Sequence, residues 1–145
     1  MRMRLLLLAA RLLLLAVLFA PLFAFAEVPA DVLTVVTDAA AALASDDVSG
    51  FLDQFDRNMP GYSVLRANAE GLLNASQVIS TIDPISNEGD DRKQSVDLDW
   101  LLAINEKDQS GIRKETRRGI VKCRLERQAK RWKIVALEPV DFFRP

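Results

Sequence analysis

Histidine is absent from the 145-residue sequence, and its absence removes several kinds of chemistry. Histidine is the commonest general base and the commonest metal ligand in proteins. Without it, Ser–His and Cys–His nucleophile pairs are excluded, and zinc and haem sites are not expected. The sequence also has no glycine-rich phosphate loop with its lysine, so nothing indicates nucleotide hydrolysis. We therefore expect neither a metal nor a cofactor.

Cysteine occurs once, at Cys123, so no disulfide can form within the chain. Period-two alternation places Cys123 on the same strand face as Val121 and Leu125. An unpaired thiol is either a small buried hydrophobe or is used in a disulfide between two chains. The apolar neighbours favour burial.

The first 26 residues have the three parts of a secretory signal peptide. A basic start precedes an apolar run, and residues 24–26 (Ala-Phe-Ala) form a small-x-small cleavage site. The alternative is a retained transmembrane anchor, but Arg11 and Pro21 leave the run short of the roughly 20 apolar residues that a span needs. We expect cleavage after Ala26, no stable membrane anchor, and export to the periplasm or the cell exterior.

Residues 27–145 are expected to form one domain of ordinary size. Residues 27–91 carry 12 acidic and two basic side chains, whereas residues 92–145 carry 14 basic and eight acidic ones. A basic half can bind nucleic acid or an anionic membrane, but it more often complements acidic helices within one fold. The basic run at residues 113–118 is interrupted by Glu115 and lacks an aromatic residue for base stacking, so we expect no nucleic-acid partner.

The sequence predicts three helices followed by a sheet. Apolar residues recur at helical spacing over residues 32–43, 48–55 and 62–74, and the turn formers at 56–61 end the second helix. Strand-like runs then cover residues 78–86, 93–104, 117–128 and 131–143. Their short links, without helical patterns, predict an antiparallel meander. Gly119 predicts a bulge or bend, and Pro139 ends regular pairing before an apolar tail.

This order, with the motifs Phe-Leu-Asp-Gln-Phe-Asp at 51–56, Met-Pro-Gly-Tyr at 59–62 and Arg-Trp-Lys-Ile-Val at 131–135, resembles the nuclear transport factor 2-like superfamily. SnoaL-like and ketosteroid isomerase-like proteins belong to that superfamily, and the resemblance covers about residues 31–143. It implies an α+β fold, a cone-shaped α+β barrel in which three N-terminal helices pack on a curved antiparallel sheet around a conical cavity. Some members use the cavity for catalysis, whereas others bind ligands or dimerise through the sheet, so the fold leaves the function open.

Two functions follow from the resemblance. The favoured one is an exported, non-catalytic domain that binds a small apolar molecule between helices and sheet, or a protein partner. The alternative is a small-molecule isomerase or cyclase of the ketosteroid isomerase type. The residues expected to line the pocket, or to form the core beneath it, are Phe51, Phe55, Tyr62, Leu72, Leu98, Trp100 and Trp132.

The alternative function requires a phenol and carboxylates in one pocket, because a steroid isomerase uses an Asp base with Tyr and protonated Asp donors. The candidates are Tyr62, Asp83, Asp97 and Asp99. Asp97 and Asp99 alternate with the most apolar face of the chain, so we expect them to point away from the helices. Lys122 and Arg124 are expected to pair with them across the sheet. This geometry favours the non-catalytic function.

Leu101 and Ala103 share a strand face with Asp97 and Asp99. They are therefore expected to form an apolar patch on the outer face of the sheet, which the helices cannot cover. Exposed apolar patches commonly mark contact surfaces. We predict a homodimer through this face.

Overall fold

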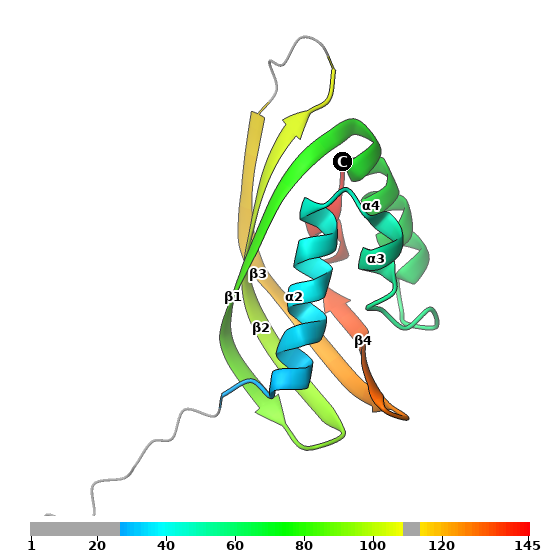
Figure 1. The fold of residues 1–145 in the computed structure, drawn as a ribbon, viewed down its shortest axis with the longest axis vertical. Coiled ribbons are helices and arrows are strands. Elements are labelled where there is room, and N and C mark those ends of the chain that lie inside the picture. The colour runs from blue at the N-terminus through cyan, green and yellow to red at the C-terminus, as the bar shows by residue number, and fades with distance from the viewer. Residues whose placement is uncertain (1–26, 109–113) are drawn as a thin grey trace, which may run out of the picture.

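Helices and strands occupy separate halves of the chain (Figure 1). The computed structural model describes residues 27–108 and 114–145, and the expected signal peptide, residues 1–26, lies outside them. In chain order the described elements are α2 (Ala30–Ala44), α3 (Val48–Leu52), α4 (Tyr62–Ala75), β1 (Ser76–Gly89), β2 (Lys93–Glu106), β3 (Lys114–Gln128), β4 (Arg131–Glu138) and the 3-10 helix η2 (Val140–Phe143). Three α-helices and a four-stranded antiparallel sheet confirm the predicted α+β class. None of the described helices is long and apolar enough to span a bilayer.

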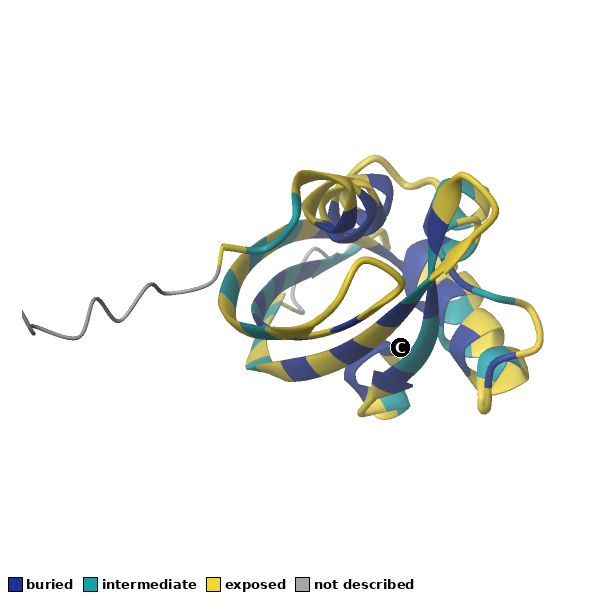
Figure 2. Cartoon of the chain, turned by 90° about the horizontal axis from the view of Figure 1, so that it is seen from below, coloured by how far each residue is buried: buried dark blue, intermediate teal, exposed yellow. Residues whose placement is uncertain are grey.

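Helix α2 packs on the sheet because one of its faces is apolar. Val36, Ala39 and Leu43 recur at helical spacing and are fully buried. Pro29 immediately precedes the helix, at an end where its missing N–H is tolerated. The three helices lie on the concave side of the curved sheet (Figures 1 and 2).

Helix α3 is shorter than the predicted stripe of residues 48–55. Asp47 caps its N-terminus by accepting a 2.8 Å hydrogen bond from a first-turn N–H. The helix ends at Leu52, and Phe55 instead pairs with Ile134 of β4 in an isolated parallel bridge. The main chain after α3 thus finds its hydrogen-bond partners on the sheet rather than in a further helical turn.

The sheet has the order β1-β2-β3-β4, and every neighbouring pair is antiparallel, as the short links predicted. Buried and exposed residues alternate along the strands (Figure 2). The residues of β2 that face the helices are all buried: Val96, Leu98, Trp100, Leu102 and Ile104.

The predicted bulge at Gly119 is wrong. Pairing shifts instead between residues 84 and 86 of β1 and between residues 124 and 125 of β3, while Gly119 stays in register opposite Trp100. The missing side chain serves packing: a Cβ on Gly119 would lie 3.3 Å from a ring carbon of Phe142. In a strand, glycine marks a close approach as readily as a bulge, and only the fold distinguishes the two.

Aromatic side chains form the centre of the core. The Phe51 ring lies 4.9 Å from the Phe55 ring and 5.3 Å from the Phe143 ring, between ring centroids. Trp100 meets Phe143 edge-on at 5.0 Å, and its indole N–H donates a 2.9 Å hydrogen bond to the Ser80 hydroxyl. Each such aromatic pair adds about 0.5–1.5 kcal/mol beyond its buried area.

Residues 139–145, here called the tail segment, return from β4 toward the helices. Regular pairing ends before Pro139, as predicted, and the next residues form η2. Phe142 and Phe143 are buried, and η2 contacts α4, β3 and β4. The predicted apolar tail therefore completes the core on the concave side of the sheet.

Candidate functional site

A groove of about 800 Å³ lies between α3, α4 and the β3–β4 hairpin. Its apolar lining comes from Val48 and Leu52 of α3, Phe55 after that helix, and the half-buried Tyr62 that begins α4. Polar side chains surround this apolar part: Ser49, Asp53, Asp56, Arg57, Arg66, Glu70, Gln128 and Lys133. We call it the α3–α4 groove.

The two aspartates of the groove are held by partners. Asp53 accepts a 2.8 Å hydrogen bond from Arg131, which, with the nearby Lys133, lowers the pKa of its carboxyl group. Asp56 accepts a main-chain N–H at 2.8 Å and the side-chain amide of Gln128 at 2.6 Å, and these bonds lower its pKa as well. Both carboxylates are therefore ionised at neutral pH, and neither has the raised pKa of a general acid.

The cations of the groove differ in how they are paired. Arg66 forms an ion pair with Glu70 one helical turn away, at 2.8 Å. Lys133 donates to the main-chain carbonyl of Asp53. Arg57 lines the groove and makes no hydrogen bond to another described residue, although its charge helps to lower the pKa of the nearby Asp53 carboxyl group. Its guanidinium is therefore available to an anionic group of a ligand.

Phe55 and Tyr62 are the only two of the predicted pocket-lining residues that line the α3–α4 groove. The other predicted lining residues are packed in the core, at 5% exposure or less: Phe51, Leu72, Leu98, Trp100 and Trp132. For Phe51 and Trp100 the physical reason is the tail segment, because the ring of Phe143 occupies the space beside them. The sequence predicted that these residues face inward but did not show that the tail fills the space in front of them.

The four candidate catalytic residues do not come together. Tyr62 lies on the helical side, whereas Asp97 and Asp99 lie on the outer face of β2. Asp83 is exposed on β1, directly opposite Asp99 in the strand register. No acid–base pair forms within one pocket from these residues.

The predicted partners of the outer carboxylates are partly corrected. Asp97 lies opposite Lys122 in the register, but the two side chains form no ion pair. Asp99 instead accepts a 2.9 Å hydrogen bond from Arg118, which lowers the pKa of the carboxyl group. Arg124 lies opposite Ser95 and not opposite Asp99, because the two strands run antiparallel. Of the two carboxylates, Asp99 therefore has a cross-strand partner on the sheet surface.

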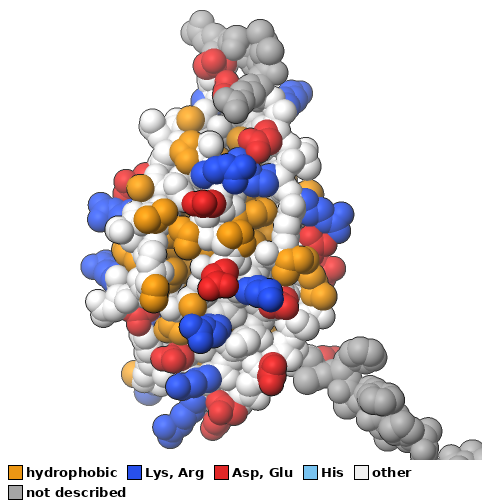
Figure 3. Space-filling model, turned by 180° about the vertical axis from the view of Figure 1, so that it is seen from behind, with side chains coloured by type: hydrophobic (Ala, Val, Ile, Leu, Met, Phe, Trp, Pro, Cys, Tyr) orange, Lys and Arg blue, Asp and Glu red, His pale blue; other side chains and the backbone are white. Residues whose placement is uncertain are grey.

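The outer face carries an apolar patch that is larger than the sequence indicated. Leu101 and Ala103 are half-buried there. Ile79 lies opposite Ala103 in the register and is 60% exposed, and Ile120 on β3 is 47% exposed. Hydrophobic side chains lie among charged ones on the side of the molecule opposite to the view of Figure 1 (Figure 3). Ile79 and Ile120 were missed because only the strand register brings them beside Leu101.

Cys123 is buried, which confirms the expectation from its neighbours. Burial, with a smaller contribution from the charge of Asp97, raises the pKa of the thiol to about 12. The reactive thiolate is therefore not formed at neutral pH. Within residues 27–108 and 114–145, acidic residues and this thiol form no cluster of three or more that suits a metal ion.

No protein-family model and no curated protein matches the chain. Solved structures are similar in fold. A Novosphingobium aromaticivorans protein provisionally named a scytalone dehydratase has a TM-score of 0.66 at 10% identity, over 74% of this chain and 78% of its own. A second protein of that organism, provisionally named an aromatic ring hydroxylase, has a TM-score of 0.65 at 15% identity, over 77% and 89%.

A nuclear transport factor 2-like protein of unknown function from Shewanella oneidensis has a TM-score of 0.56 at 13% identity, over 74% of this chain and 93% of its own. Identities this low establish similarity of fold but not a shared activity. The helices, the curved antiparallel sheet and these neighbours agree with the resemblance seen in the sequence. The chain has the nuclear transport factor 2-like fold.

Proposed function

We propose that the protein is an exported, non-catalytic binding domain whose ligand site is the α3–α4 groove. The observation that carries the proposal is Arg57, whose N–H donors make no hydrogen bond within the described residues, beside an apolar lining of Leu52 and Phe55. A ligand that matches this arrangement is a small molecule with an apolar body and one anionic group. In small-molecule sites, placed polar groups fix the orientation of a ligand whose apolar body rests on the apolar lining.

The non-catalytic part of the proposal has separate support. An isomerase or cyclase needs its acid and base within reach of one substrate. Tyr62 is on the opposite side of the sheet from Asp97 and Asp99, and the groove carboxylates already have hydrogen-bond partners. The names of two structural neighbours refer to a dehydratase and a hydroxylase, but the four candidate catalytic residues of this chain do not share one pocket.

The test uses 8-anilinonaphthalene-1-sulfonate, a fluorescent probe with an apolar body and one sulfonate. We expect saturable binding to the folded protein. Arg57→Ala should weaken that binding about tenfold, because a hydrogen bond to a charged group contributes about 1.5–3 kcal/mol and each 1.4 kcal/mol is tenfold in Kd. Titration of probe fluorescence gives the dissociation constants.

The matched control is Arg124→Ala, which removes an exposed arginine from the outer face of the sheet. It should leave probe binding unchanged, and circular dichroism should show that both variants remain folded. Equal affinities of the Arg57 variant and the wild-type protein would contradict the proposed site. Turnover of a ketosteroid or polyketide-type substrate, lost in Tyr62→Phe, would support the alternative function instead.

A further inference from the structure

The tail segment packs against five residues from three places in the fold. They are Gly61 before α4, Asn68 and Gly71 on α4, and Arg117 and Gly119 on β3. We call these five residues the tail channel. It is separate from the α3–α4 groove, with which it shares none of its residues.

Two glycines of the channel leave room for the tail segment. A Cβ on Gly71 would come within 2.8 Å of the Pro145 ring, and one on Gly119 within 3.3 Å of the Phe142 ring. At Gly61, where φ is +77°, a Cβ would lie 3.4 Å from Val140. Gly71 and Gly119 therefore lack a side chain where the tail segment passes, whereas at Gly61 the positive φ is what favours glycine.

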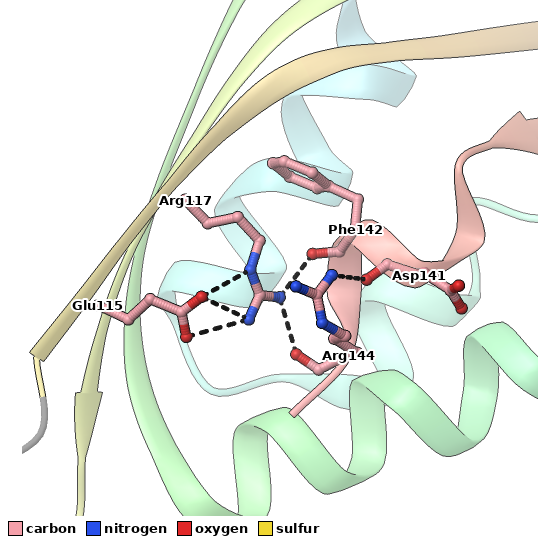
Figure 4. A network of polar contacts seen from close by, with 5 residues as sticks. All are labelled: Glu115, Arg117, Asp141, Phe142 and Arg144. Atoms are coloured by element: carbon pink, nitrogen blue, oxygen red, sulfur yellow. Dashed lines mark hydrogen bonds and ion pairs between the residues drawn. The ribbon is translucent and has the colours of Figure 1, made fainter.

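Polar groups of the channel bind the main chain of the tail segment. The Arg117 guanidinium donates to the carbonyl oxygens of Phe142 at 2.7 Å and Arg144 at 2.8 Å (Figure 4). Glu115 holds the same guanidinium at 3.0 Å. At the other end of the segment, Asn68 donates to the carbonyl oxygen of Val140 at 3.3 Å. Charged donors to main-chain carbonyls give affinity for a peptide, and the pockets for its side chains give specificity.

The tail segment pairs with no strand in the described part of the chain. Its own main-chain hydrogen bonds, from Phe142 to Pro139 and from Arg144 to Asp141, are both 3.1 Å long and lie within the segment. The rest of the molecule holds it through the buried rings of Phe142 and Phe143 and through the two polar side chains of the channel. A separate peptide of the same sequence can make every one of these contacts.

We propose that the tail channel is a peptide-binding site, filled by the chain's own residues 139–145 and able to accept the same segment from a second copy. The covalent link gives the chain's own segment an effective concentration in the millimolar range. Exchange between copies therefore follows either cleavage of the link or a very high protein concentration. The recognised chemistry is two consecutive phenylalanines with the main-chain carbonyl groups beside them.

The experiment cuts the link after folding. A protease recognition sequence is inserted between Glu138 and Pro139, both of which are exposed, and the folded full-length chain is cleaved there. We expect the released segment to remain bound through gel filtration. A fluorescein-labelled peptide of residues 139–145 should then replace it, whereas the same peptide with both phenylalanines changed to serine should not. Loss of folded structure on cleavage, or failure of the labelled peptide to exchange, would overturn the proposal.

Two neighbouring arginines on β3 provide a matched pair of variants. Arg117 faces the tail channel, whereas Arg118 is on the outer face beside Asp99. In the cleaved protein, Arg117→Lys should weaken peptide binding about tenfold, because lysine keeps the charge but loses the planar fork that reaches two carbonyls. Arg118→Lys should leave peptide binding unchanged. Equal effects of the two substitutions would contradict recognition by the channel.

A second arm needs no inserted sequence. Phe142→Ser in the intact chain weakens the binding of the chain's own tail segment and does not change the channel residues. Fluorescence anisotropy should show the labelled peptide binding this variant at least tenfold more tightly than it binds the wild-type protein. Equal binding to the two proteins would refute competition between the tail segment and the peptide.

Discussion

Gly119 shows how the absence of one side chain organises its surroundings. It stays in register opposite Trp100 on the sheet, and the space beside it is taken by the ring of Phe142. A larger residue would force that ring to move, and overpacking of this kind typically costs about 1–3 kcal/mol. Gly119 thus contributes to the core by leaving space for the Phe142 ring.

At the residue scale, Asp53 predicts a dependence of stability on pH. Its pKa is lowered from 3.8 in the folded state, chiefly by the hydrogen bond from Arg131. Stability from this pair is fully present above the unfolded pKa and is lost as the pH falls through the lower folded pKa. Because the pair is exposed, we expect a loss under about 1 kcal/mol.

The measurement compares Asp53→Asn with the wild-type protein by urea unfolding between pH 2 and pH 6. The two proteins should differ most at pH 6 and converge as the pH falls below the ordinary range of an aspartate. Asp38→Asn, a substitution on the exposed face of α2, is the control. A constant difference across the whole pH range would show that the ion pair is not its source.

At the scale of elements, the outer face of β2 predicts self-association. Leu101 and Ala103, joined in the strand register by Ile79, form an apolar strip with charged residues on either side. We propose that two copies meet on this strip. Leu101→Glu should leave the monomer folded and weaken the dimer, because an unpaired carboxylate would be buried at the contact.

Sedimentation at micromolar concentrations measures the association. Leu33→Glu, at a 39% exposed position on α2, is the matched control and should leave the dimer intact. A wild-type protein that sediments only as a monomer would exclude a stable dimer. Dissociation by the control substitution would place the contact on α2 instead.

Local patterns predicted the elements well because burial follows a simple period in each of them. Alternation around Trp100 correctly assigned the inner face of β2, and the turn formers before Tyr62 correctly separated α3 from α4. Contacts between distant segments left no such periodic signal. The sequence could not show that Arg117 binds carbonyls 25 and 27 residues later, or that Phe143 fills the space in front of Trp100.

At the scale of the whole molecule, we predict that the protein is exported. The signal-peptide pattern of residues 1–26 predicts a mature chain that begins at Glu27. The intact mass of the protein purified from the extracytoplasmic fraction should correspond to residues 27–145. Replacing Ala24 and Ala26 by bulky residues should block this cleavage and retain the precursor in the membrane fraction. Full-length protein in the soluble cytoplasmic fraction would contradict export.

The position of the tail segment also sets the time at which the molecule can fold. Phe142 and Phe143 follow every other core residue in the sequence, so the core lacks two of its rings until the ribosome has released them. Partly synthesised chains then keep apolar surface exposed, which makes them prone to aggregate until those rings are in place.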